Sequence, residues 1–187
     1  MGAVSEIHQD GIEDRTTKTP EERPRRCWDW MIVTGTCHYA RNRSSFVTYR
    51  RVGRYITESI LGLSKSYVAG VGTVELRVRP SKNKRTPSRT LILENVLHIP
   101  GSICNGFCWT EYHSKHGGYT FFKETYSGKD AQKYPLWHGE PYWDLQRLVL
   151  AGSPQGETYL CTGEPESLSL FVDKECLERI YGINRQK

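Results

Sequence analysis

The segment SYVAGVGTVELRVR, residues 66–79, is the feature that most limits how this chain can fold. In its second half apolar and polar side chains alternate, as in a β-strand with one buried face. Gly70 and Gly72 interrupt the alternation and mark places where the strand must bend. Similar short segments, bounded by Gly, Pro or Asn, recur at spacings of roughly ten residues along the chain. The pattern predicts a mainly β protein built as a small β-barrel.

The rest of the chain supplies further strand candidates and one helix candidate. The segments with strand character are WDWMIV at 28–33, SFVTYRRV at 45–52, TLILENVLHIP at 90–100, GGYTFFKETYSGKDA at 117–131 and ESLSLFV at 166–172. We expect the fourth of these to be a hairpin that turns at Ser127-Gly128. The segment YWDLQRLVLAG, residues 142–152, fits a strand or a short helix, because its apolar positions do not settle the period. DKECLERIYGI, residues 173–183, predicts a helix capped by Asp173.

The composition changes at Cys27, and three regions follow from it. Residues 1–26 are polar and charged, and they hold too little apolar surface to offset the entropy of ordering, so we expect a disordered N-terminal tail. Residues 27–114 hold the strands of the expected barrel. Residues 115–187 predict a β extension that ends in a C-terminal helix and packs on the barrel. Hydrophobic residues at 37% and charged residues at 25% are typical of a soluble globular protein.

The sequence also indicates a compartment. No run approaches the ~18 apolar residues of a membrane-spanning helix, and the opening MGAVSE lacks the apolar core of a signal peptide. We therefore expect a cytoplasmic or nuclear protein whose six cysteines are free thiols. Cys104 and Cys108 lie four positions apart, but no clean second pair of ligands accompanies them. We expect neither a metal ion nor another cofactor.

The net charge of +5 permits a weak attraction to nucleic acid without establishing one. The clearest basic run, RPSKNKRTPSR at 79–89, lies between two strand-like segments and contains Pro, Ser and Asn. This composition is typical of a long exposed hairpin loop. Nucleic acid is therefore not an expected partner.

Three motifs resemble a known family in type, order and spacing. WMIVTGTCHYARNRSSFVTY, VAGVGTVELRV and LILENVLHIPGSICN are similar to the retropepsin-like aspartic protease domain of Copia-type retrotransposon polyproteins. The tail LVLAGSPQGETYL adds a weaker resemblance to stand-alone fungal proteins that carry this transposon-derived barrel. The positions of the first motif that match are Trp30, Thr34, Gly35, His38, Asn42, Arg43, Ser44, Phe46 and Tyr49. The resemblance implies a domesticated retropepsin-like barrel, and a homodimer as its ancestral assembly.

The departure from the family pattern concerns the catalytic residue. The family's catalytic Asp stands directly before the Thr-Gly pair, where this chain has Val33, and the family's Ala after Gly is Thr36. Aspartic proteases use two carboxylates that share one proton, one from each subunit in a retropepsin. Asp29, four residues away on an extended strand, lies ~13 Å from that position. Proteolysis is therefore not expected.

Other side chains near the turn are candidates for different chemistry. Thr34 keeps a hydroxyl there, and Cys37 and His38 follow it. Adjacent residues of an extended chain point to opposite faces, so Cys37 and His38 are not expected to pair with each other. His98, which replaces the family's Tyr, is expected to be a half-exposed strand residue. A structural role is favoured over a catalytic one for these residues.

Two classes of function remain open. The first is a binding or self-association module whose partner is a second copy of the chain, a peptide or a small molecule in the old cleft. The second is a non-proteolytic enzyme of the cyclase, lyase or isomerase type that acts on a small molecule there, for example in fungal secondary metabolism. The residues expected to line such a cleft are Thr34, Gly35, Thr36, Trp109, Tyr119 and Trp137.

Overall fold

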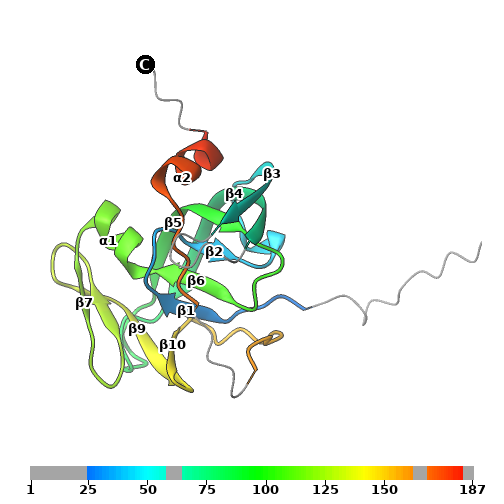
Figure 1. The fold of residues 1–187 in the computed structure, drawn as a ribbon. Helices are drawn as coiled ribbons and strands as arrows, with labels where there is room; N and C mark the ends of the chain where they lie inside the picture. Colours follow the sequence, from blue (N-terminus) through cyan, green and yellow to red (C-terminus); the bar gives the residue numbers. More distant parts are fainter. Residues whose placement is uncertain (1–24, 58–64, 162–167, 183–187) are drawn as a thin grey trace, which may run out of the picture.

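The computed structural model describes residues 25–57, 65–161 and 168–182, and these residues form a mainly β fold (Figure 1). The strands are β1 (Trp30–Val33), β2 (Tyr39–Ala40), β3 (Arg50–Thr57), β4 (Lys65–Val78), β5 (Arg89–His98), β6 (Asn105–Cys108), β7 (Tyr119–Phe121), β8 (Ser127–Lys129), β9 (Pro135–Tyr142) and β10 (Leu145–Leu148). The helices are the 3₁₀ turn at Arg43–Ser45, α1 (Trp109–His116) and α2 (Lys174–Tyr181). The mainly β prediction is confirmed.

The strands form one sheet with the order β3-β4-β5-β2-β6-β1-β10-β9-β8-β7. β3 and β7 lie at its two ends and far apart in space (Figure 1), so the sheet is not closed among the described residues, and a closed barrel is not confirmed. β1 lies inside the sheet, parallel to β6 and antiparallel to β10. The expected barrel strands and the expected C-terminal extension therefore share one sheet.

The strand β1 is buried on both faces. Trp30 and Ile32 pack into one apolar cluster together with Phe107, while Met31 and Val33 pack into a second cluster on the other face. A strand covered on both faces needs a continuous apolar run instead of an alternating one. This explains why WMIV carries no polar residue.

The long β4–β5 hairpin follows the alternation that the sequence shows. The basic segment after Val78 connects the two strands as a loop, as predicted. The register between β4 and β5 shifts between Gly72 and Val74. A side chain at Gly72 would collide with the backbone of Thr48, so this glycine also allows a close approach of the preceding chain.

Three local predictions have definite outcomes. The C-terminal helix is confirmed as α2; Asp173 is at its N-cap position, but its side chain makes no capping hydrogen bond to the helix. The segment at 142–152 supplies the end of β9 and all of β10, so it forms strands. The hairpin turn at Ser127-Gly128 is wrong, because both residues belong to β8 and Gly128 lies against the ring of Trp137. The helix α1 was not predicted.

The predicted tail lies almost entirely outside the described residues, which begin at Arg25. No helix in the described part of the chain has the length and apolar character needed to cross a membrane.

Candidate functional site

The position that holds the acid in the resembled family lies in an apolar environment. Val33 ends β1, aligned with Cys108 of the parallel strand β6, and is 5% exposed. It packs in the cluster that contains Cys37 and Leu170. An ionised carboxylate at this position would lose its hydration without gaining a partner among these side chains.

The turn that follows Val33 is hydrogen-bonded to a later segment of the same chain. The Thr34 and Ser169 hydroxyls are 2.8 Å apart, and the Thr36 amide donates to the Leu170 carbonyl at 3.0 Å. The Thr36 hydroxyl donates to the Val172 carbonyl at 3.0 Å and accepts from the Val172 amide at 2.8 Å. Thr34 and Thr36 remain exposed at the surface. Residues 169–172 thus occupy the hydrogen-bonding groups of the turn.

Gly35 is needed for this arrangement. Its φ of +127° is unfavourable for residues with a Cβ, and a Cβ there would collide with the carbonyl oxygen of Leu170. Gly35 and Leu170 form a parallel β-bridge. The glycine therefore lets the two segments approach closely.

Cys37 and His38 are both buried and do not pair with each other. The Cys37 thiol faces the Leu170 carbonyl at 4.0 Å, and burial raises the pKa of this thiol, so it is not a thiolate nucleophile. The His38 Nδ1 accepts a hydrogen bond from the Cys108 amide at 3.1 Å, which leaves the ring proton on Nε2. Burial lowers the pKa of His38 to about 3, so its imidazole is neutral.

His98 is also a buried side chain, and the expectation of half-exposure is wrong. It is 8% exposed, and its Nδ1 lies 2.8 Å from the Tyr49 hydroxyl. Its Nε2 donates to the Arg41 carbonyl at 3.1 Å, so Nδ1 accepts from Tyr49 in the neutral ring. Burial lowers the pKa of His98. Both ring nitrogens are engaged in structural hydrogen bonds.

The aromatic residues expected to line a cleft are not brought together. Trp137 is fully buried and packs against Phe107 at a ring distance of 5.3 Å. Trp109 contacts Phe122 at 5.1 Å, and Tyr119 is 53% exposed on β7. None of the three expected residues lines the pocket described next. Within the described ranges, no three His, Cys, Asp or Glu side chains are placed to hold a metal ion.

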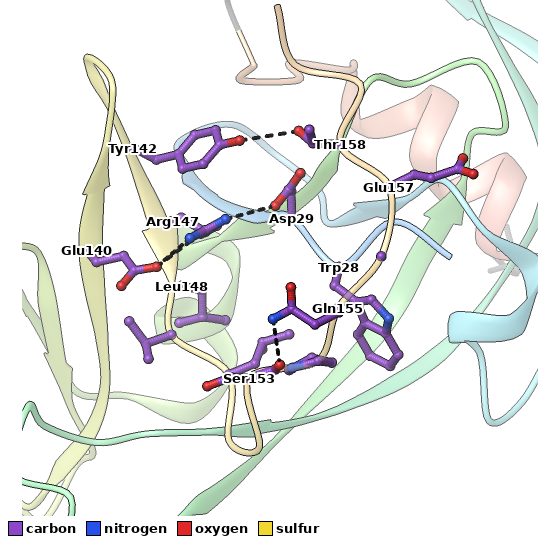
Figure 2. A pocket seen from close by; sticks show the side chains of 14 residues that line it. Trp28, Asp29, Glu140, Tyr142, Arg147, Leu148, Ser153, Gln155, Glu157 and Thr158 are labelled. Carbon is purple, nitrogen blue, oxygen red and sulfur yellow. Dashed lines mark hydrogen bonds and ion pairs between the residues drawn. The ribbon is translucent and has the colours of Figure 1, made fainter. Parts of the chain in front are cut away.

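A pocket lies at the opposite end of β1, where sequence reasoning did not place a site. It has a volume of about 360 Å³, within the usual range for small-ligand sites. Its walls are Trp28 and Asp29 before β1, the β9–β10 hairpin with the residues after it, and the coil at 153–158 (Figure 2). The Tyr142 hydroxyl reaches the Thr158 hydroxyl across it at 3.3 Å.

Three charged side chains form the polar centre of this pocket. Figure 2 shows the Arg147 guanidinium between Glu140 and Asp29. Its Nε and Nη2 donate to Glu140 Oε1 at 3.1 and 2.7 Å, and its Nη1 donates to Asp29 Oδ1 at 3.2 Å. Burial acts to lower the pKa of Arg147, but the hydrogen bonds to Glu140 and Asp29 outweigh it and raise that pKa.

Asp29 has one oxygen without a partner. Asp29 is 7% exposed, and its Oδ2 is buried with no hydrogen-bond partner in the structure. The sequence signal for this site was a charged residue inside the aromatic run WDW, directly before a fully apolar strand.

Comparison of the chain with protein-family models, with curated proteins and with solved structures gave no match.

Proposed function

We propose that the chain is a retropepsin-like β-barrel domain that lacks proteolytic chemistry and acts by binding. The order and spacing of the three motifs support the resemblance, and the mainly β fold is compatible with it. The observation that carries the loss of proteolysis is Val33, an apolar side chain buried in the core at the position of the acid.

The chemistry of peptide hydrolysis leads to the same conclusion. An aspartic protease needs one carboxylate to activate water and a second to protonate the carbonyl. Two copies of this chain brought together at their Thr-Gly-Thr turns would present two valines. Removal of acid–base catalysis at both positions leaves no group at the turn to move the proton.

Binding is favoured over self-association through the old turn. A second copy that used the hydrogen-bonding groups of Thr34 and Thr36 would first have to displace residues 169–172, which already satisfy them. We therefore propose that the chain binds a peptide or a small molecule and that its ancestral dimer contact is not used.

The second candidate is a non-proteolytic enzyme of the cyclase, lyase or isomerase type. The pocket beside Asp29 favours it, because a cavity of about 360 Å³ with a buried carboxylate can orient a small molecule. The buried and hydrogen-bonded state of Cys37, His38 and His98 argues against chemistry at the turn itself.

The test is a cleavage and sedimentation experiment on the full chain. A fluorogenic peptide library is incubated with the protein between pH 4 and pH 7, and sedimentation velocity is run at the same concentrations. We expect no cleavage and a monomer. Cleavage blocked by a transition-state inhibitor of aspartic proteases would refute the loss of proteolysis, and a dimer disrupted by Thr36→Val would refute the binding proposal in favour of self-association.

A further inference from the structure

We propose that the pocket beside Asp29 binds a ligand through an ammonium or guanidinium group that donates to the Asp29 carboxylate. The proposal goes beyond the proposed function, because it concerns the opposite end of β1 from the Thr-Gly-Thr turn. It holds whether or not the chain is related to a protease, and a failure to bind here would leave the proposed loss of proteolysis unaffected.

The charge of the pocket favours a cation. At its polar centre the two carboxylates of Asp29 and Glu140 face the single guanidinium of Arg147 (Figure 2), whereas Glu157 points away from this centre and lies near the charges of Arg25 and Arg41. The polar centre of the pocket therefore carries one more negative charge than positive charge. Such a site attracts cations and repels anions at close range.

The arginine of the pocket is not free to bind an anion. Its Nε, Nη1 and Nη2 all donate to Glu140 and Asp29 at distances from 2.7 to 3.2 Å. An anionic ligand would have to replace two carboxylates that already neutralise this guanidinium. Among the carboxylates, Glu157 also has its own partners, the Arg25 amide and the Tyr159 hydroxyl.

Asp29 supplies the acceptor that the ligand needs. Arg147 satisfies Oδ1, but Oδ2 is buried with no hydrogen-bond partner. A buried acceptor without a partner destabilises the fold, and more so when it is charged. A donor on the ligand would remove this destabilisation and form a charge-assisted hydrogen bond. Because Oδ2 is buried, the proposal requires the Asp29 carboxylate or the coil at 153–158 to move when the ligand binds.

The rest of the lining describes the body of the ligand. Leu150 and Pro154 supply apolar surface. The rings of Trp28 and Tyr142 are covered by the guanidinium groups of Arg26 and Arg147, at 3.7 and 4.4 Å, so neither covered face is available to stack on the ligand's cation. The geometry fits an N–H-bearing cation on a short carbon chain. A free alkylamine and the Lys or Arg side chain of a peptide share this chemistry.

The experiment is a titration of the full chain followed by nuclear magnetic resonance and calorimetry. The probes are n-butylamine and agmatine as free amines, and capped lysine and a Lys-containing tripeptide as peptide forms. Butanol, butyrate and tetramethylammonium are the controls for chain length, charge sign and the need for N–H donors. We expect saturable binding of the N–H cations alone, with shifts at Gln155 and Thr158. Tighter binding of the free amines or of the peptide forms identifies the source.

Variants localise the binding. Asp29→Asn presents an amide N–H₂ to the ligand's donors and should weaken binding about tenfold or more, as expected for the loss of a charge-assisted contact. Glu140→Gln, at a more exposed carboxylate, is the second variant in case Asp29→Asn does not fold, and it should weaken binding severalfold. Asp130→Asn is the matched control, because Asp130 pairs with Arg89 outside the pocket. It should bind like the wild type.

Several results would overturn the proposal. These are equal binding of tetramethylammonium or butanol, preference for butyrate, unchanged affinity in both pocket variants, and absence of any saturable shift with all four N–H cations.

Discussion

The two ends of β1 differ in almost every physical respect. At its C-terminal end, Val33 is buried among apolar side chains, and the turn after it is hydrogen-bonded to residues 169–172 of the same chain. At its N-terminal end, Asp29 lies beside Arg147 in a pocket and keeps one buried oxygen without a partner. The first end has its hydrogen bonds satisfied internally, whereas the second retains unused binding capacity.

The residues that carry the resemblance and the residues with unused binding capacity therefore lie at opposite ends of one strand. The Thr-Gly-Thr turn carries the resemblance, but its polar groups hold the fold together. The carboxylate that keeps an unused acceptor, that of Asp29, lies four residues before Val33. The motif points to the C-terminal end of β1, whereas the buried acceptor without a partner, Asp29 Oδ2, lies at the N-terminal end.

Placing an acid at position 33 should have the largest effect. Val33→Asp puts a carboxylate into the apolar cluster and should lower the free energy of unfolding by about 3–5 kcal/mol, because the buried charge has no partner. Urea denaturation measures this. Val47→Asp is the control, since Val47 is 62% exposed, and it should change stability by less than about 0.5 kcal/mol. Equal effects of the two substitutions would mean that the acid position is open to water.

Substitution of the turn glycine should have the next largest effect. Gly35→Ala combines an unfavourable φ of +127° with a collision against the Leu170 carbonyl, and should cost about 2–4 kcal/mol of unfolding free energy. Gly101→Ala is the matched control, because a Cβ there meets no atom within 4 Å. A loss of unfolding free energy in Gly35→Ala as small as in the control would contradict the close contact between the turn and Leu170.

The C-terminal end of β1, after which His38 is buried, should also determine how stability depends on pH. The pKa of His38 is about 3 in the folded protein, where burial and then the charges of Lys115 and His116 lower it, against about 6.5 when unfolded. The unfolded chain therefore binds more protons below pH 6.5. His38 stabilises the fold fully above pH 6.5, and this is lost as the pH falls towards 3. The loss should be about 2 kcal/mol between pH 7 and pH 5.

The check is the slope of the unfolding free energy against pH. His38→Gln should remove this contribution, while the effect of His98, whose pKa burial also lowers, stays in place. A variant with the slope of the wild type would show that His38 titrates normally in the folded protein.

Substitutions at the N-terminal end of β1, beside the pocket, should change the unfolding free energy less. Arg147→Met leaves the Asp29 and Glu140 carboxylates without their shared cation and should cost about 1–3 kcal/mol. The value lies below that of a fully buried pair, because the Arg147 side chain is 33% exposed. Asp29→Asn should cost under about 1 kcal/mol, since it removes a charge that is only half satisfied. Thermal and urea unfolding of both variants measure this order, and its reversal would contradict the assignment of Arg147 as the cation that holds the two carboxylates.

Much of the sheet could be predicted because alternation and burial leave direct marks on the sequence. The second half of β4 alternates, and β1 is a continuous apolar run because both of its faces are covered. The helix α2 was recognisable from Leu177 and Ile180 on one face, both of which are buried.

Other features depend on contacts between distant parts of the chain and left no local mark. Gly128 belongs to a strand because the Trp137 ring occupies the space of its side chain, although Ser-Gly is typical of a turn. The helix α1 begins after Cys108 without a side-chain cap and buries only Tyr112. The pocket required Arg147, which lies 118 residues from Asp29 along the chain, and no pattern in the sequence joins them.

The most direct test of the contrast between the two ends is native-state hydrogen exchange at the Thr36 and Val172 amides. These amides donate to the Leu170 carbonyl and to the Thr36 hydroxyl, so they report on the contact between the turn and the segment at 169–172. We predict protection close to that of the β1–β6 amides in the core. Exchange as fast as in the loop after Val78 would show that the turn is open to a partner, and would contradict the account.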